Sequence, residues 1–246
     1  MVWYMALNGF KIACLGMVLI FIVSAYSVFA DEPDPTFLSG CSLSNSQQQD
    51  RAWCETEKSE GVTNFTKTIQ GSDLNAYKGV CIIDSPIEII YDILSNVSEH
   101  SKWIKYCATS RELDRPSDKQ SFQYYDFDVP WPLANRDIVV HCTTEADWGR
   151  GKITIQSEAV KEPLVPIRKN HMRITDSRQE WILEQVTPDS TRVTFVSYTN
   201  MEGPVSKMLN KLISKVIPSS SLKNLKKISM EKYLSASDRF IAKTYP

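Results

Sequence analysis

The segment SPIEIIYDILSN, residues 85–96, is the point where the hydrophobic pattern of this chain changes from alternating to helical. Ser85 is the expected N-cap, Pro86 the first helical residue, and Glu88 follows three residues after the cap. Apolar side chains then recur at helical spacing, at Ile87, Ile90, Tyr91, Leu94 and Val97. The pattern predicts a helix ending near Asn96, with a further turn or two up to residue 106.

Outside this helix, alternation of apolar and polar residues predicts strands. Two precede the helix, at 62–69 and 74–83, with a turn at 71–73 between them. Six regions follow it, at 110–113, 122–129, 138–144, 153–160, 171–186 (broken near Asp176) and 192–200. Turns are expected at 148–151 and 188–190. From Pro204 the helical pattern returns, is interrupted at Pro218, and continues to Leu234.

This order of elements predicts an α+β chain with one large antiparallel sheet. A sheet of that size twists and curls, which gives it a concave face. The long terminal helix is amphipathic and must bury its apolar side, for which the concave face is the natural partner. Wherever sheet and helix do not fully meet, an apolar cavity is expected.

Composition excludes several classes of protein. The chain has 246 residues, 42% of them hydrophobic, and a net charge of -1, which excludes a disordered chain. Only 9 Gly and 12 Pro exclude collagen-like and low-complexity sequences, and a pI near 6.3 gives no reason to expect nucleic acid. Residues 205–246 carry nine basic and two acidic side chains, whereas residues 31–204 carry 18 and 27. This basic end indicates either an anionic surface as partner or a solvated helix face.

The first 30 residues have the pattern of a secretory signal peptide. Lys11 precedes an apolar run at 12–30 that ends in Val-Phe-Ala before the acidic Asp31 and Glu32. The alternative is an uncleaved membrane anchor, and both predict an exported protein, periplasmic or secreted. Leu38-Ser-Gly-Cys41 resembles a lipoprotein box but does not adjoin the apolar run, so it is interpreted as a loop. Residues 31–49 are then a leader, 50–235 the folded domain and 236–246 a tail.

Five cysteines remain after the signal peptide, so at least one is unpaired within the chain or pairs with another chain. Cys41 and Cys54 flank a polar segment and form the expected disulfide. Cys81 and Cys142 lie in apolar strand patterns and are expected to be buried. No pair has the CxxC spacing of a zinc site.

The run Pro130-Trp-Pro-Leu-Ala-Asn-Arg-Asp137, before an apolar strand, carries a family resemblance. Agreeing matches in the same order are Trp53, the helix start at Ser85, Met172-Arg-Ile174, Trp181-Ile-Leu183 and Gly203-Pro204. Over residues 50–235 the chain resembles the START family, the lipid-transfer domains related to steroidogenic acute regulatory protein. The resemblance implies a helix-grip fold: a curved antiparallel sheet wrapped around a long C-terminal helix, enclosing a hydrophobic tunnel for one lipid.

Candidate ligand-binding residues follow from strand alternation and from the terminal helix. They are Tyr125, Phe127, Val129, Ile138, Val140, Cys142, Trp181, Phe195, Leu222 and Leu225, with Ser197 and Thr199 on the same face as Phe195.

The resemblance places a gate at the mouth of the tunnel. It consists of Trp131 and Leu133 in a stiff, proline-containing loop and of Arg136 and Asp137 at the base of the loop. Arg136 and Asp137 are expected to pair, the alternative being that both face water. Trp131 suits a membrane interface, the alternative being a place in the core.

The terminal helix is expected to be a lid that docks on membranes. Lys223, Lys226 and Lys227 would meet anionic headgroups, and Pro218 followed by three serines would form a hinge.

Two functions fit this pattern. The first is a non-enzymatic, monomeric carrier that binds a lipid or sterol-like ligand and exchanges it during transient contact with an anionic membrane. The second is an enzyme on the same fold, resembling a polyketide cyclase or aromatase. No GxSxG, HExxH or phosphate-loop motif occurs, and His100, His141 and His171 lack metal-ligand spacing. No catalytic residue, metal or cofactor is therefore expected.

The signal-peptide interpretation predicts that the mature chain begins at Asp31. Expression in the native host followed by N-terminal sequencing is expected to return Asp-Glu-Pro-Asp. An intact Met1 on protein recovered in the membrane pellet would instead indicate the uncleaved anchor.

Overall fold

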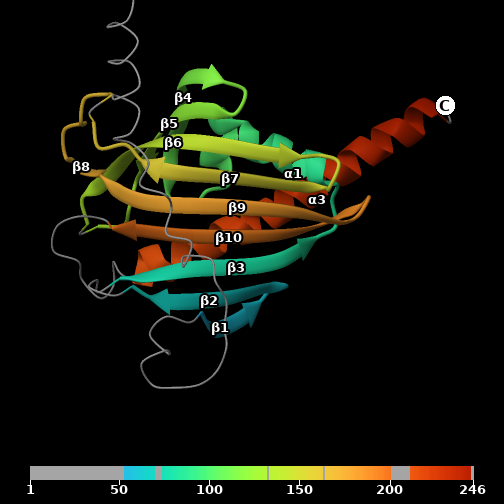
Figure 1. Cartoon of the computed structure of the whole chain (residues 1–246), viewed down its shortest axis with the longest axis horizontal. Helices are drawn as coiled ribbons and strands as arrows, with labels where there is room; N and C mark the ends of the chain where they lie inside the picture. Colours follow the sequence, from blue (N-terminus) through green and yellow to red (C-terminus); the bar gives the residue numbers. More distant parts are fainter. Residues whose placement is uncertain (1–52, 70–73, 132, 163, 201–210, 245–246) are drawn as a thin grey trace, which may run out of the picture. The chain divides into compact units, whose positions relative to one another are not determined.

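Ten strands of the described chain pair into one curved sheet (Figure 1). The computed structural model describes residues 53–69, 74–131, 133–162, 164–200 and 211–244. The strand order is β1-β2-β3-β10-β9-β7-β6-β5-β4, with β8 beside β6. The strands are β1 Cys54–Ser59, β2 Val62–Thr68, β3 Asn75–Ile83, β4 Cys107–Ser117, β5 Gln120–Phe127, β6 Asn135–Asp147, β7 Lys152–Ala159, β8 His171–Ile174, β9 Asp176–Thr187 and β10 Ser190–Asn200.

All neighbours in the sheet are antiparallel except β6 and β8. Residues 135–138 of β6 pair in parallel with β8, and residues 140–147 pair with β7. The predicted break near Asp176 is confirmed, since β8 ends at Ile174 and β9 begins at Asp176. Neither β1 nor the parallel pairing was predicted. The turns at 148–151 and 188–189 are confirmed.

The helices of the described chain lie on one side of the sheet, behind the strands in Figure 1. They are α1 Ile87–Ser95, the 3-10 helix η3 Val97–Lys102, the π-helical turn η4 Leu212–Val216 and α3 Ile217–Thr244. Helix α3 contacts α1, β2, β3 and β10. This arrangement confirms the predicted fold: a large curved sheet wrapped on a long C-terminal helix.

The docking of α3 depends on a glycine in β3. Leu222 and Leu225 are fully buried, and a Cβ added at Gly79 would lie 2.6 Å from Cδ2 of Leu222 and 2.4 Å from the hydroxyl of Tyr77. Tyr77 cannot easily turn away, because it is buried and its hydroxyl donates to Oδ1 of Asn64 at 2.7 Å. Only a residue without a side chain lets the helix approach this closely.

The start of α1 differs from the prediction. Pro86, with ψ of 147°, is the N-cap, and no side chain caps the helix. Ser85 instead lies in a turn, where its N–H donates to the Ile83 carbonyl and its own carbonyl accepts from Oγ1 of Thr191. The Ser85 hydroxyl is buried and has no hydrogen-bond partner among the described residues. The residue before a proline favours an extended backbone, which displaces the cap by one position.

Pro218 does not break the terminal helix. The helix runs from η4 into α3 without a gap, and the N–H of Ile217 donates to the Leu212 carbonyl, five residues back. Pro218 has no N–H to donate, and the helical hydrogen bonds before it change from the α pattern to the π pattern, so the helix does not end there. Ser221 does not cap a new helix, since its hydroxyl donates back to the Ile217 carbonyl at 2.8 Å. Most of the expected tail at 236–246 belongs to α3, which reaches Thr244.

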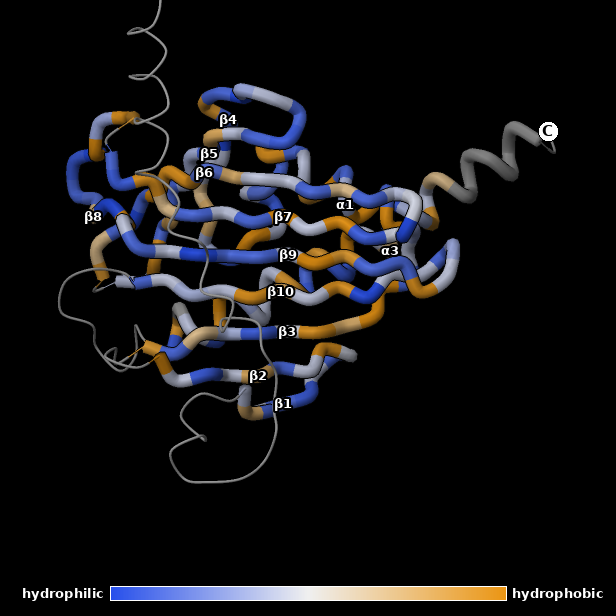
Figure 2. The backbone as a smooth tube through the Cα atoms, in the orientation of Figure 1, coloured by the Kyte–Doolittle hydropathy of each residue, from blue (hydrophilic) through white to orange (hydrophobic). Residues whose placement is uncertain are grey.

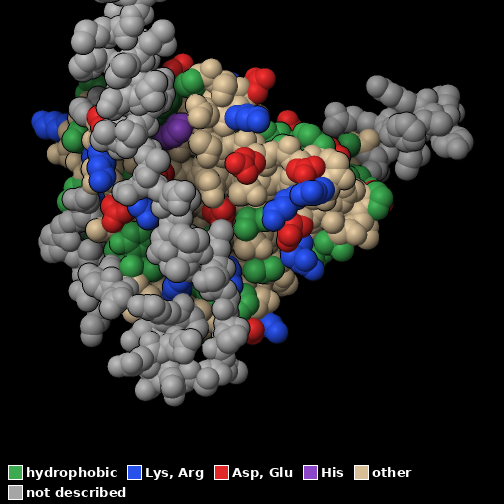
Figure 3. All heavy atoms as spheres, in the orientation of Figure 1, with side chains coloured by type: hydrophobic (Ala, Val, Ile, Leu, Met, Phe, Trp, Pro, Cys, Tyr) green, Lys and Arg blue, Asp and Glu red, His purple; other side chains and the backbone are tan. Residues whose placement is uncertain are grey.

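The face of the sheet away from the helices carries ion pairs. Arg178 pairs with Glu158 at 3.1 Å, and Arg192 lies 3.9 Å from Glu184. Figure 2 shows hydrophobic and hydrophilic residues interchanging along the strands, and Figure 3 shows acidic and basic side chains beside one another on this face. Such alternation is expected where one face packs on a core and the other faces water. Among the described residues, no helix is long and apolar enough to cross a bilayer.

The substitution Gly79→Ala is expected to lower the free energy of unfolding by about 1–3 kcal/mol, because the added methyl group overpacks the α3 interface. Urea denaturation followed by circular dichroism measures the change. Gly149→Ala is the matched control, since its nearest heavy atom is Oδ1 of Asp147 at an ordinary 3.5 Å. Equal stability of the two variants would contradict the role given to Gly79.

Candidate functional site

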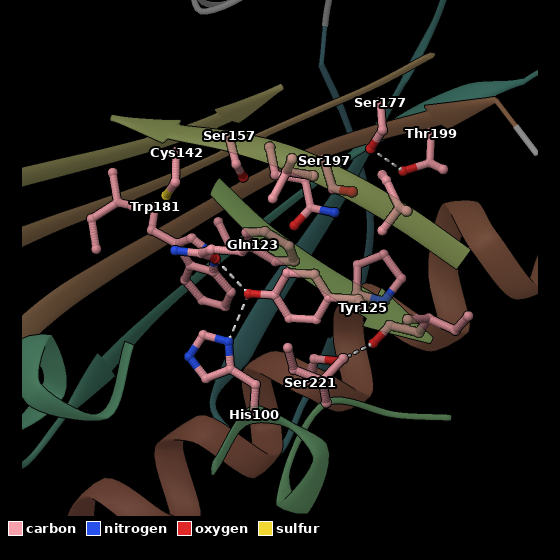
Figure 4. Close-up of a pocket in the computed structure, with 18 of the residues that line it drawn as sticks. His100, Gln123, Tyr125, Cys142, Ser157, Ser177, Trp181, Ser197, Thr199 and Ser221 are labelled. Carbon is pink, nitrogen blue, oxygen red and sulfur yellow. Dashed lines mark hydrogen bonds between the residues drawn. The ribbon is translucent and has the colours of Figure 1, made fainter. Parts of the chain in front are cut away.

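A cavity lies between the concave face of the sheet, η3 and the beginning of α3 (Figure 4). It holds about 110 Å³ of free space. Its described lining consists of Leu94, His100, Trp103, Ile104, Gln123, Tyr125, Phe127, Ile138, Val140, Cys142, Ile155, Ser157, Ile174, Ser177, Gln179, Trp181, Phe195, Ser197, Thr199, Ile217, Pro218 and Ser221.

Aromatic rings form one wall of the cavity. Trp181 on β9 and Phe195 on β10 are partners in the strand register, and their rings stack at 3.8 Å and 11°. The Trp103 ring meets Trp181 edge to face at 6.1 Å. These three large side chains give a rigid apolar surface against which a hydrocarbon ligand can pack.

A chain of hydrogen-bonded polar side chains adjoins this aromatic wall, where the His100 ring meets Trp103 edge to face at 5.1 Å, and Figure 4 shows three of its members converging. Nδ1 of His100 lies 2.9 Å from the Tyr125 hydroxyl, and Nε2 of His100 lies 3.1 Å from the Leu94 carbonyl. The Tyr125 hydroxyl lies 2.7 Å from the Gln123 amide, whose other end lies 2.8 Å from the hydroxyl of Ser121. All four side chains in this chain are buried.

Two groups that can only accept, the Leu94 carbonyl and the amide oxygen of Gln123, orient this hydrogen-bonded cluster. Nε2 of His100 carries the proton that the Leu94 carbonyl accepts. The Tyr125 hydroxyl donates to Oε1 of Gln123, and the amide nitrogen of Gln123 donates to the Ser121 hydroxyl. Burial lowers the pKa of His100 to about 4, so the imidazole is uncharged at neutral pH. The hydrogen-bonded cluster of His100, Tyr125, Gln123 and Ser121 is therefore uncharged at neutral pH.

A second polar group lies on the sheet side of the cavity. Ser157, Gln179 and Ser197 are direct cross-strand neighbours on β7, β9 and β10. None of the three makes a side-chain hydrogen bond to another described residue. Ser177 and Thr199, next along β9 and β10, are 2.8 Å apart and hydrogen-bonded to each other. The row of Ser157, Gln179 and Ser197 thus offers unused neutral donors and acceptors to the cavity.

The other titratable groups of the wall are neutral too. Burial raises the pKa of the Cys142 thiol to about 11 and raises that of Tyr125 well above its ordinary value. None of the described lining residues is Asp, Glu, Lys or Arg. The described residues contain no group of three or more His, Cys, Asp or Glu that could hold a metal ion.

Seven of the ten predicted ligand-binding residues line the cavity: Tyr125, Phe127, Ile138, Val140, Cys142, Trp181 and Phe195. Ser197 and Thr199 join them. The other three do not: Val129 is buried beyond the end of β5, and Leu222 and Leu225 belong to the core between α3 and the sheet. The apolar side of α3 is directed at β3, so its cavity contacts come from Ile217, Pro218 and Ser221 instead.

The gate residues split into an exposed tip and a buried base. Trp131 is 90% exposed, which excludes the alternative of a core position, and Leu133 is half-buried. The predicted pairing of Arg136 with Asp137 is wrong. Adjacent residues of a strand point to opposite faces, so the two side chains cannot meet. Arg136 donates to the Ala134 carbonyl.

Asp137 pairs with Arg173 of β8 on the face of the sheet away from the cavity. Nε of Arg173 lies 2.7 Å from Oδ1 and its terminal nitrogen 2.9 Å from Oδ2, so the contact is bidentate. Asp126, the register partner of Asp137, accepts from Arg168 and lies 2.9 Å from Nε2 of His171. These contacts attach β8 and the segment before it to β5 and β6.

The three predicted docking lysines do not form one exposed face. Lys223 lies 2.9 Å from Glu60 and 3.0 Å from the Ser59 hydroxyl, and the Lys226 ammonium lies against Gly61 in the same β1–β2 turn. Only Lys227 of the three is exposed. Two of the lysines therefore contact the sheet edge.

The cysteine predictions are met where the structure can show them. Cys81 and Cys142 are buried, and burial raises the pKa of Cys81 to about 11 and that of Cys107 to about 12. Cys54 is exposed at the start of β1. Cys41 lies outside the described residues, so the Cys41–Cys54 disulfide stays a prediction.

Several lining residues were missed from the sequence, and most had a signal. Gln123, Ser157 and Gln179 each lie two residues from a predicted or apolar inward position, so the same alternation places them in the cavity. His100 and Trp103 come from η3 and the turn after it, where no periodicity indicates a direction.

This chain matches known proteins both in sequence and in structure. The family model described as START domain matches residues 41–231. An uncharacterised protein of Pseudomonas aeruginosa is 28% identical over 174 residues, 71% of this chain and 85% of that protein. The phosphatidylcholine transfer protein of Mus musculus is 25% identical over 162 residues, 64% of this chain and 74% of that protein. A solved structure of a STAR-related lipid transfer protein fragment from Xanthomonas axonopodis has 27% identity and a TM-score of 0.64, covering 72% of this chain and 98% of that one.

The lowered pKa of His100 predicts a loss of stability in acid. The unfolded chain takes up this proton near pH 6.5 and the folded chain only near pH 4, so stability falls as the pH drops through this range. His100 is therefore expected to lower the free energy of unfolding by about 3 kcal/mol between pH 7 and pH 4, at roughly 1.36 kcal/mol per pKa unit. His100→Gln is expected to lack this component when the free energies of unfolding at pH 7 and pH 4 are compared. The same pH dependence in both proteins would contradict a neutral, buried His100.

Proposed function

The chain belongs to the START domain family, and from this membership and the geometry of the cavity we propose that it binds one lipid molecule and carries it between membranes. The observation that carries the proposal is the cavity itself. Its wall combines stacked aromatic rings and aliphatic side chains with a few neutral polar groups. This composition is typical of sites for apolar small molecules.

Lipid entry requires part of the wall to move. The 110 Å³ of free space is well below the ~300–1,000 Å³ of typical ligand pockets. The beginning of α3 is the proposed moving part, because Ile217, Pro218 and Ser221 line the cavity and the π-helical η4 adjoins them. Hydrogen exchange at 212–221 is expected to slow when lipid is bound; unchanged exchange would place the movement elsewhere.

The cavity chemistry supports a carrier over the cyclase-like enzyme. A general acid or base works best when its pKa is near the operating pH. The pKa of His100 is about 4, and both ring nitrogens already have hydrogen-bond partners. The raised pKa values of Cys142 and Tyr125 leave these groups protonated at neutral pH. We therefore propose transfer without chemical change of the ligand.

We further propose that the protein acts outside the cytosol and contacts an anionic membrane for a short time during exchange. The signal-peptide pattern of residues 1–30 supports the compartment. The exposed Trp131 at the gate and the exposed Lys227 on α3 support the membrane contact, since tryptophan favours the interface and lysine favours anionic headgroups.

Val140→Trp is expected to fill the cavity and weaken lipid binding by at least about tenfold while the protein stays folded. Lipid retained after gel filtration of protein incubated with vesicles measures binding, and circular dichroism checks the fold. His141→Trp is the control, because the neighbouring side chain points to the other face of β6 and stacks on Phe122. Full binding by folded Val140→Trp would show that the ligand does not occupy this cavity.

Trp131→Ala is expected to slow lipid transfer between vesicles several-fold without changing stability, because the removed ring is 90% exposed. A fluorescence transfer assay with anionic donor vesicles measures the rate. The matched control is Trp148→Ala, which removes the exposed tryptophan of the β6–β7 turn. Equal rates for the two variants would leave the gate loop without a part in membrane contact.

A further inference from the structure

We propose that the ligand is an uncharged lipid with a hydroxyl or ester carbonyl, of the diacylglycerol class, whose polar group lies inside the cavity. This inference rests on the proposed lipid-carrier function and narrows it. It excludes a charged or zwitterionic phospholipid headgroup from the interior of the cavity.

The first argument is the electrostatics of the wall. The described lining contains no charged side chain, and its one basic group, His100, is neutral. The nearby carboxylates Asp126 and Asp137 are sequence neighbours of the lining residues Tyr125 and Ile138. Alternation directs them to the opposite face, where Arg168 and Arg173 neutralise them. Arg136, two residues before Ile138 and on the same face of β6, is buried, but it is not among the lining residues and it donates to the Ala134 carbonyl. A buried phosphate would therefore meet no opposite charge among the described lining residues.

The energetic difference between the two kinds of headgroup is large. Moving an ionised group into an apolar site without a partner costs far more free energy than moving a hydroxyl. A hydroxyl that finds a hydrogen-bond partner recovers that cost. The wall of this cavity provides such partners and provides no charge.

The second argument is the row formed by Ser157, Gln179 and Ser197. The three side chains stand side by side on adjacent strands and line the cavity. Each can both donate and accept a hydrogen bond, and none uses its side chain to bond another described residue. This matches a ligand hydroxyl, which also donates and accepts, or a carbonyl, which accepts.

A third observation is the indole of Trp103, which lies between this cavity and a second pocket formed by α1, η3 and α3. Its N–H is buried and has no hydrogen-bond partner among the described residues. Buried donors without a partner are rare, because an unsatisfied donor keeps the full cost of its desolvation. A ligand oxygen that accepts from it removes this penalty, and an indole N–H suits a neutral carbonyl as well as it suits a hydroxyl oxygen.

The test compares three lipids that share their acyl chains. Mature protein is incubated with vesicles containing a trace of radiolabelled dioleoylglycerol, dioleoylphosphatidic acid or dioleoylphosphatidylcholine, and the lipid retained after gel filtration is counted. Retention of dioleoylglycerol at least about tenfold above both phospholipids is expected. Equal or better retention of either phospholipid would overturn the inference and leave the carrier function standing. Retention of none of the three would count against the carrier function and this inference together.

A variant locates the polar contact. Gln179→Leu keeps the size of the side chain and removes its hydrogen-bonding groups, so dioleoylglycerol is expected to bind about tenfold more weakly. Gln185→Leu, an exposed position on the same strand, is the matched control and should bind normally. Unchanged binding by Gln179→Leu, with the phospholipids still rejected, would overturn the role of the row. Weaker binding by both Gln179→Leu and Gln185→Leu would also overturn the role of the row, since the loss of binding would then not be specific to the cavity.

Discussion

The contact between helix α3 and strand β3 is the constraint on which the rest of this structure depends. Leu222 packs against the bare backbone of Gly79, and Leu225 is buried beside it, so the helix is held close to the concave face. Away from this contact the sheet curves away from the helix, and the cavity remains between them. The position of the helix thus decides both the volume of the cavity and which of its side chains reach the ligand.

The architecture could be predicted because its signals are local. The alternation of residues 138–142 identified the inward face of β6 correctly, and the change of period at residue 85 located α1. The direction of α3 could not be predicted, because the sequence of an amphipathic helix identifies its apolar side but not the part of the sheet that this side meets. Leu222 and Leu225 were for this reason assigned to the cavity although they fill the core.

The polar contacts that were predicted wrongly or missed have a common cause. Arg136 and Asp137 are neighbours in sequence but not in space, and the partner of Asp137 is Arg173, 36 residues later. The pairing depends on β8 lying parallel to β6, and periodicity predicts a strand in this region but not the strand with which it pairs. The position of His100 in the cavity could not be predicted either, because His100 lies in a 3-10 helix, where periodicity gives no direction. The sequence alone therefore predicts which face a strand residue takes, but not which distant side chain it meets.

None of the described residues that line the cavity is Asp, Glu, Lys or Arg, and the buried Arg136 nearby donates to the Ala134 carbonyl. Ion pairs lie on the outer face and at the sheet edge, and the described cavity wall is neutral. Native mass spectrometry of protein recovered from its own compartment tests the central claim most directly. The account predicts the mass of the mature chain plus one lipid, in a 1:1 complex that Val140→Trp loses. Ligand-free protein that takes up no lipid from vesicles, or equal lipid on Val140→Trp, would contradict it.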